Sequence, residues 1–211
     1  MGVIVKHAPD LFDQNGVSQK AALNGYASHY YSLSRLNATG TIEIDGQTYE
    51  VSGLAWMDHE FGSRFLEPDQ TGWDWFSIQL DDGTDLMLLQ IRRSDGSIDT
   101  HSTGTMVSSD GKSTHLSFSQ FSLSPRDRWQ SPGSGATYPV AWHVEVPDAQ
   151  LTFDVRPAIP DQELKTTQST GIVYWEGSTR VTGVSAARRV HGAGYLEMTG
   201  YARQDLPDAL H

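Results

Sequence analysis

Two acids and a histidine stand in a row in this chain, close to glycines and tryptophans. They are Asp58, His59 and Glu60, and Trp56 precedes them. A carboxyl group can act as a general acid or base, and a neighbouring histidine titrates near neutral pH. On a strand, alternation would place Asp58 and Glu60 on one side and His59 on the other, so the three cannot all face one ligand. The alternative is a charged rim, in which they pair with Arg64 or with one another.

Two further carboxylates stand beside tyrosines. Glu176 follows Tyr174, and Glu197 follows Tyr195, at the spacing that puts two side chains on one face of a strand. Glutamates that share an apolar cavity tend to have pKa values that are pushed apart, as acid/base catalysis requires. These two acids therefore join the candidate catalytic residues. The alternative is one internal ion pair with Arg180 and one glutamate on the surface.

Aromatic side chains occupy positions where a ligand-binding face would need them. Alternation over residues 73–80 predicts one face with Trp73, Trp75, Ser77 and Gln79, and an opposite face with Asp74, Phe76, Ile78 and Leu80. We expect substrate contacts from Trp56, Trp73, Trp75, Tyr174, Tyr195 and Tyr201. If such faces line the inside of a small barrel, they form a ligand cavity with a few placed polar groups. If they point outward, they are ordinary surface.

A serine nucleophile and a metal centre have weaker support. The chain has no cysteine, no G-x-S-x-G sequence and no HExxH sequence. An ester hydrolase would therefore need an unconventional site, for example Ser63 beside His59. His143 and Glu145 have same-face spacing on a strand, which alone is weak evidence for a metal ligand set. We expect neither a metal nor a cofactor.

The composition restricts the partners of the protein. The 211 residues carry a formal net charge of −11, which argues against nucleic acid and anionic membranes, because both require a basic surface. No apolar run approaches the ~20 residues that span a bilayer, so no transmembrane segment is expected. The N-terminus has no apolar signal core. This indicates a cytoplasmic protein as the sequence stands, or a periplasmic or exported one if the chain is a fragment.

Strand-like segments alternate with turn signals from residue 28 onward. Four Asp-Gly pairs mark hairpins, because both residues tolerate positive φ. We expect strands at roughly 28–36, 39–45, 48–57, 73–81, 84–93, 97–108, 113–124, 138–147, 149–156, 171–182 and 191–203. The pattern predicts an all-β antiparallel barrel of about ten strands, with a two-sheet sandwich as the alternative. Along the chain this implies an irregular N-terminal extension or linker, the barrel, and a tail, at 1–27, 28–205 and 206–211.

Several spaced motifs together resemble one known family. They are Ser28-His-Tyr-Tyr-Ser32 with Arg35, Gly53-Leu-Ala-Trp-Met-Asp-His-Glu-Phe-Gly62, Gly72-Trp-Asp-Trp-Phe-Ser77, Tyr174-Trp-Glu-Gly177 and Gly194-Tyr-Leu-Glu-Met-Thr-Gly-Tyr201. In this order they resemble the AttH / hydroxyneurosporene synthase-like family, which includes carotenoid 1,2-hydratases. The resemblance implies two tandem lipocalin-like (calycin-type) β-barrels, of which this chain would hold only the second. A homodimer could then replace the missing first barrel.

The resemblance also implies a chemistry. The hydratases of the family protonate an isolated alkene, and water captures the resulting cation, which requires a buried acid and aromatic faces. By resemblance, Asp58 is the acid or its anchor, and Trp73 and Trp75 stabilise the cation. Glu60 and Phe61 replace the Asn-Trp of the hydratase branch. Three functions stay open: hydration or cyclisation of an isoprenoid-like alkene, ester hydrolysis by the same His/acid cluster, and binding of a lipid or pigment without turnover.

Overall fold

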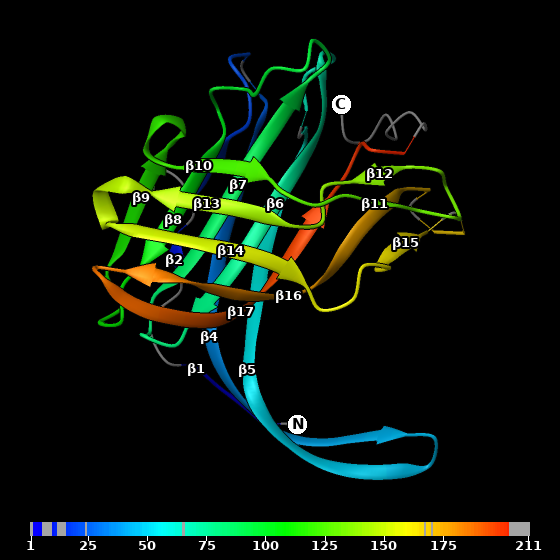
Figure 1. Ribbon diagram of the computed structural model, residues 1–211. Coiled ribbons are helices and arrows are strands. Elements are labelled where there is room, and N and C mark those ends of the chain that lie inside the picture. Colours follow the sequence, from blue (N-terminus) through cyan, green and yellow to red (C-terminus); the bar gives the residue numbers. More distant parts are fainter. Residues whose placement is uncertain are drawn as a thin grey trace.

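The chain folds almost entirely into antiparallel β-strands (Figure 1). The computed structural model describes residues 2–5, 10–11, 16–23, 25–64, 66–166, 168–169 and 171–202. Helical structure in this part consists of two 3-10 turns, η1 (Phe118–Gln120) and η2 (Pro147–Ala149). No helix among the described residues is long and apolar enough to cross a membrane. The predicted all-β antiparallel class is confirmed.

A ten-stranded sheet forms the body of the molecule. Its strands pair in the order β10, β13, β14, β16, β17, β6, β7, β8, β9, and β15 pairs with β16. Their bounds are β6 (Gln70–Leu80), β7 (Asp85–Arg93), β8 (Thr103–Val107), β9 (Ser113–Ser117), β10 (Ser122–Pro125), β13 (Trp142–Val146), β14 (Leu151–Pro157), β15 (Glu163–Lys165), β16 (Val173–Ser185) and β17 (Arg188–Met198). The sheet curls so that β10, β13 and β14 cross in front of β6 and β7 (Figure 1). Its end strands, β9 and β10, are joined by η1, and full closure into a barrel stays a prediction.

The inside of the curled sheet is an apolar core. Phe76 and Ile78 of β6, Leu196 of β17 and Trp142 of β13 are all buried there. The rings of Phe76 and Trp142 meet edge-on, with 5.5 Å between their centroids. Burying one such side chain contributes roughly 1.5–3 kcal/mol. The alternation predicted for β6 is therefore confirmed, since its apolar positions share this core.

A second sheet is built around one long hairpin. Its strands, β4 (Ala27–Ile44) and β5 (Gln47–Gly62), pair along most of their length, with a bulge between Leu33 and Leu36. The half of the hairpin near its turn projects away from the body (Figure 1). The other half lies against β6 and β7, where its side chains join a small cluster of buried residues. The hairpin therefore covers part of the outer face of the curled sheet.

The Asp-Gly turns predicted from the sequence are confirmed. At the tip of the β4–β5 hairpin, Asp45 and Gly46 have φ angles of 51° and 75°, as a type I′ turn requires. Gly83, Gly96 and Gly111 also have positive φ, and each lies at or next to a turn between strands. These four turns define where neighbouring strands reverse direction. The register of the outer-face residues follows from them.

Segment 1–27 is not irregular throughout, which corrects the expectation from sequence. The short strands β1 (Gly2–Val5), β2 (Asp10–Leu11) and β3 (Val17–Gln19) all pair with β4. They supply partners for the backbone groups along an edge of that strand. The tail 206–211 lies outside the described residues, and the domain boundaries stay predictions.

Two strand boundaries bear on the site. β5 continues past residue 57 to Gly62, so the acidic motif lies within a strand rather than in a loop. The segment expected to be a strand from residue 97 begins as one only at Thr103. The reason is local: the backbone N–H of His101 donates to the side chain of Asp99 at 2.8 Å, which stabilises a turn before β8. A further two-stranded ribbon, β11 (Trp129–Gln130) with β12 (Thr137–Tyr138), lies largely between the strands expected at 113–124 and 138–147.

Candidate functional site

A cavity of about 240 Å³ lies between the outer face of the ten-stranded sheet and the β4–β5 hairpin. Its wall combines aromatic and aliphatic side chains with three carboxylates and one ammonium group. The lining residues are Lys20, Tyr30, Asp58, Glu60, Leu66, Trp73, Trp75, Leu89, Ile91 and Glu197. A largely apolar cavity with a few convergent polar groups is the usual form of a small-molecule site.

This location corrects the expectation that a ligand would sit inside the curled sheet. The apolar core fills the inside, whereas Trp73, Trp75 and Glu197 line the cavity on the other face. That face is no ordinary surface, because the hairpin covers it. Trp56 of β5 meets Trp75 edge-on with 6.3 Å between ring centroids, and Tyr30 of β4 packs in the same cluster. Alternation predicts the two faces of a strand but not which of them the sheet encloses.

Glu197 contributes an enclosed carboxyl group from β17. Trp73 Nε1 donates a hydrogen bond to Glu197 Oε1 at 3.1 Å. Burial, and after it the charge of Glu176 directly opposite on β16, raise the pKa of Glu197 to about 7, while the bond from Trp73 lowers it. An acid with such a pKa can hold a proton at neutral pH and release it during a reaction. This is the property that a general acid requires.

Asp58 reaches the same cavity from β5. Ser32 Oγ and Trp56 Nε1 both donate hydrogen bonds to Asp58 Oδ1, the latter at 2.9 Å. The residue lies at the open side of the cavity, but these side chains and Tyr30 surround its carboxyl group. Burial raises the pKa of Asp58, and the hydrogen bonds from Ser32, Trp56 and Tyr30 oppose that rise. Asp58 is thus a second acid held in a defined orientation.

Glu60 differs from the other two acids because it has a cationic partner. Lys20 Nζ lies 2.9 Å from Glu60 Oε1, and Ser28 Oγ donates to the same oxygen. The Lys20 ammonium also lies 5.5 Å from the centroid of the Tyr30 ring, a distance that suits a cation–π contact. The cavity therefore combines one ion pair with two acids, Asp58 and Glu197, whose pKa values are raised by burial.

A second hollow of about 380 Å³ adjoins the cavity. The two share Asp58 and Trp75, so they form neighbouring parts of one binding region. The second hollow is lined by Leu54, Ala55, Trp56, Asp58, Trp75, Ser77, Gln79, Ala193, Gly194 and Tyr195. It runs between β5, β6 and β17. An elongated ligand could extend from the enclosed acids toward the more open end.

The structure brings together most of the catalytic candidates. Asp58, Glu60 and Glu197 line one cavity, although they come from β5 and β17. Glu176 lies beside Glu197 on the neighbouring strand and acts on it by charge. The roles of these residues in a reaction stay predictions. What the geometry establishes is that acids far apart in the sequence share one small volume.

His59 lies apart from the acids. It points to the opposite face of β5, as alternation predicts, and it is not among the residues that line the cavity. Its Nδ1 is 2.9 Å from Tyr31 Oη, and its ring centroid is 5.3 Å from that of Phe61. Ser63 is exposed just beyond the end of β5. The pair expected for ester hydrolysis is therefore absent from the cavity wall.

Four of the predicted aromatic contacts reach the binding region, and two do not. Trp73 and Trp75 line the enclosed cavity, while Trp56 and Tyr195 line the adjoining hollow. Tyr201 lies against the apolar core.

The remaining tyrosines have other partners. Tyr201 Oη donates to the buried Asp74 at 2.9 Å, and its ring lies 3.8 Å from the guanidinium of Arg92. Burial and the charge of Glu176 raise the pKa of Tyr174 to about 12. Tyr174 thus lies near the acids of the outer face but does not line the cavity. Tyr201 belongs to a buried ionic network.

Sequence reasoning missed two polar residues of the cavity. Tyr30 belongs to the motif Ser28–Ser32, and alternation within it puts Tyr30 on the same face as both serines, so a signal was present. Lys20 lies in the segment that the sequence pattern assigned to an irregular extension. No periodicity marks it, because its position depends on contacts with distant parts of the chain.

The weak metal candidates lie elsewhere. His143 and Glu145 share a face of β13 as predicted, and His143 Nδ1 is 2.7 Å from Asp154 Oδ1 on β14. Within the described ranges, no group of three or more His, Cys, Asp or Glu residues is arranged to hold a metal ion. The histidine is thus accounted for by its carboxylate neighbour.

Fold and site together define a class of β-proteins, in which a curled antiparallel sheet and a long hairpin enclose carboxylates among tryptophans. The model of the AttH-like family matches residues 3–201, and the chain belongs to this family. The family that the sequence motifs resemble is thereby confirmed.

Solved structures agree with this assignment. An AttH protein of Nitrosomonas europaea shares 36% identity and a TM-score of 0.85, over 95% of this chain and 60% of its own. Kievitone hydratase from Nectria haematococca shares 16% identity and a TM-score of 0.73, over 92% of this chain and 58% of its own. CghA with Sch210972 shares 9% identity and a TM-score of 0.53, over 88% of this chain and 57% of its own. The last two likenesses concern the fold alone.

The chain spans less than two thirds of the length of each of these three proteins. Whether the unmatched parts correspond to a first barrel stays a prediction. A comparison with curated proteins found no match.

Proposed function

We propose that the protein is a hydratase-type enzyme that adds water to a carbon–carbon double bond of a hydrophobic, isoprenoid-like substrate. The observation that carries the proposal is the enclosed carboxyl of Glu197, with a pKa of about 7, in one cavity with Asp58 and Glu60. Hydration of an alkene needs an acid that is protonated before the reaction and a base that accepts a proton from water. The cavity offers a carboxyl group for each role.

The reaction can be written with these groups. The protonated Glu197 carboxyl gives its proton to one alkene carbon, and the electron pair of the double bond forms the new C–H bond. A water oxygen then bonds to the carbocation at the other carbon. The Asp58 carboxylate, or that of Glu60, accepts the proton that this water loses. Return of that proton to Glu197 restores the enzyme, so the net change is alkene plus water to alcohol.

The aromatic wall suits such an intermediate. Trp73 and Trp75 line the same cavity as the acids, and the face of an indole ring attracts a positive charge. Trp75 is buried and Trp73 is half-buried, so this attraction is screened less there than in open solution. The small volume of the cavity, about 240 Å³, also limits how many water molecules can reach the cation, which favours capture by one positioned water.

Family membership and the likeness in fold to a kievitone hydratase support this choice. Ester hydrolysis has less support, because His59 lies on the far face of β5. Cyclisation of an alkene would use the same acid without the water step. Binding without turnover is the remaining alternative, and it needs no titrating acid at all.

The test is incubation of the purified chain with kievitone and with acyclic terpenoid alkenes in ¹⁸O-labelled water, followed by mass spectrometry. We expect a product that has gained one labelled water. Glu197→Gln removes the proton donor but keeps the shape of the side chain, so it should lose the product while still binding the substrate. A product of unchanged mass would indicate cyclisation, and no product from any alkene would contradict the proposal.

A further inference from the structure

Lys20 enters the cavity from a segment that belongs to neither the ten-stranded sheet nor the β4–β5 hairpin. Its side chain is only 7% exposed, and its Nζ lies 2.9 Å from Glu60 Oε1. Removing an ammonium group from water is costly unless a carboxylate and further contacts compensate for it. The ion pair with Glu60 and the ring of Tyr30 supply that compensation. The ammonium of Lys20 can stay at Glu60 only if the backbone of Lys20 is itself fixed in position.

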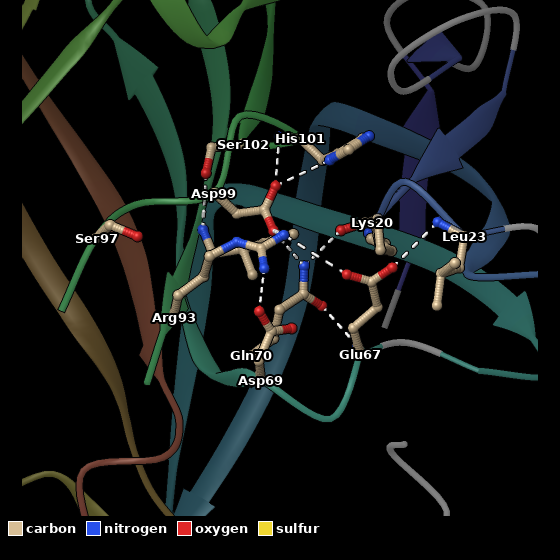
Figure 2. A network of polar contacts seen from close by, with 12 residues as sticks. Lys20, Leu23, Glu67, Asp69, Gln70, Arg93, Ser97, Asp99, His101 and Ser102 are labelled. Atoms are coloured by element: carbon tan, nitrogen blue, oxygen red, sulfur yellow. Dashed lines mark hydrogen bonds and ion pairs between the residues drawn. The ribbon is translucent and has the colours of Figure 1, made fainter. Parts of the chain in front are cut away.

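The backbone of Lys20 is held on both sides. Its N–H donates to the carbonyl of Tyr26 at 2.8 Å, and its carbonyl accepts from Gln70 Nε2 at 2.9 Å. The same Gln70 Nε2 donates to Asp99 Oδ2 at 2.7 Å, while Gln70 Oε1 accepts from the backbone N–H of Glu67 at 2.8 Å (Figure 2). Gln70 thus connects the segment that carries Lys20 to the start of β6 and to the turn before β8.

Charged groups complete this network (Figure 2). Asp99 is buried, and Arg93 Nη2 lies 2.5 Å from its Oδ2 and 3.5 Å from Glu67 Oε2. The backbone N–H of Leu23 donates to Glu67 Oε1 at 3.1 Å, which adds a second attachment of the segment. Polar networks whose members are all satisfied rigidify the region that they connect.

We infer that Lys20 is a positioning residue of the site: its ammonium fixes Glu60 in the cavity, and the Gln70–Asp99–Arg93 network fixes Lys20. The role given to Glu60 rests on the proposed function. The position of Lys20 and its effect on the neighbouring acids do not, so they can be tested without turnover. The segment that carries Lys20, expected from the sequence to be an irregular extension, thus forms a wall of the site.

The first experiment follows the titration of Glu197 by tryptophan fluorescence. Trp73 donates to Glu197, so its emission should change with a midpoint near pH 7, and Trp73→Phe should remove that change. The charged and titratable groups around Glu197 come from five places: Glu176 and Tyr174 from β16, Tyr195 from β17, Asp58 and Glu60 from β5, Tyr30 from β4, and Lys20. All but Lys20 disfavour the glutamate anion or are neutral.

Lys20→Met removes the positive charge and should raise the midpoint by about half a pH unit to one unit. Lys20→Arg keeps the charge and should stay within about a fifth of a unit of the wild-type midpoint. If Lys20 had only a structural role, Lys20→Met would lower the melting temperature but leave the midpoint of the Glu197 titration unchanged. That result would overturn the inference.

A second measurement decides the matter if Lys20→Met does not fold. Limited acetylation of lysines, read by peptide mass spectrometry, should modify Lys20 at least tenfold more slowly than the exposed Lys165 in the wild type. In Glu60→Gln the Lys20 rate should rise severalfold while the Lys165 rate does not change. An unchanged Lys20 rate would mean that Glu60 does not hold it. Neither measurement depends on turnover. A negative hydration assay would therefore contradict the proposed function without contradicting the positioning role of Lys20.

Discussion

Glu197 connects the chemistry of the cavity to the stability of the protein. An ordinary glutamate has a pKa of 4.5, and the folded protein raises that of Glu197 to about 7. Between these values the folded state binds more protons than the unfolded state. The free energy of unfolding therefore falls as the pH rises through this window.

Glu197→Gln should remove that fall. The contribution is at most roughly 3.5 kcal/mol, because the pKa values of 4.5 and about 7 differ by about 2.5 and one pKa unit corresponds to about 1.4 kcal/mol. Urea denaturation from pH 4 to pH 8 should show a flatter profile for the variant than for the wild type. Glu145→Gln, on the exposed side of β13, is the matched control and should follow the wild type. If the free energy of unfolding changed with pH equally in Glu197→Gln and the wild type, the raised pKa of Glu197 would be contradicted.

Asp58 gives a second prediction at the same scale. Asp58→Asn keeps the acceptor oxygen for Trp56 and Ser32 but cannot take a proton from water. We expect turnover to fall about 100-fold or more, the usual contribution of a general acid or base. The melting temperature should change by no more than a few degrees, as differential scanning calorimetry can show. If unfolding rather than turnover is affected, Asp58 is mainly structural.

At the scale of elements, β6 lies between the cavity on one face and a buried ionic network on the other. Trp73 and Trp75 face the cavity, whereas Asp74 is fully buried on the core side, 3.2 Å from Arg92 Nε and bonded to Tyr201. Burial raises the pKa of Asp74, and Arg92 opposes that rise. The ionic network and the cavity thus lie on opposite faces of the same strand.

Asp74→Ala should therefore be destabilising without acting on the chemistry. Removing one partner of a buried ion pair costs about 3–5 kcal/mol, because the other charge remains. Denaturant unfolding should show this loss, and the Trp73 fluorescence titration should keep its midpoint near that of the wild type. Asp82→Ala, in the exposed turn after β6, is a control that should cost little. A shifted titration midpoint in Asp74→Ala would mean that the faces are coupled.

Elements are also the scale at which sequence reasoning succeeded best. Alternation placed Phe76 opposite Trp75, and the Asp-Gly pairs marked the turns, because both signals are local. The face toward which the sheet curls depends on all ten strands together, and no local pattern contains it. For the same reason no local pattern predicts Lys20 as a site residue. Its position is set by Gln70 and Asp99, which are fifty and more residues away in the sequence.

For the whole molecule, the projecting half of the β4–β5 hairpin is the notable surface. That half projects beyond the body (Figure 1), and by strand alternation its apolar side chains lie on the face opposite to the one that carries Trp56 and Asp58. Ile42, Ile44, Tyr49 and Val51 are 50%, 57%, 46% and 39% exposed. Exposed apolar side chains gathered on one face are typical of interaction surfaces. The homodimer expected from the sequence stays a prediction, and this face is where it can be tested.

Ile42→Ser combined with Tyr49→Ser should weaken self-association. Sedimentation velocity at several protein concentrations should show a dimer for the wild type and a monomer for the double variant. Thr41→Ser, on the opposite face of β4, is the matched control and should behave as the wild type. A wild-type chain that remains monomeric at every concentration would contradict the homodimer.

The position of the cavity on the outer face of the sheet has a consequence for how such proteins can diversify. Changes at Trp56, Trp73 or Leu89 alter the binding region, while the core residues on the other face of the same sheet keep their neighbours. Mutations that create new ligand preferences are thereby largely decoupled from those that determine folding. A library restricted to the hairpin and the outer face should retain a high proportion of folded members. Such a scaffold tolerates exploration of new substrates better than one whose binding site is its own hydrophobic core.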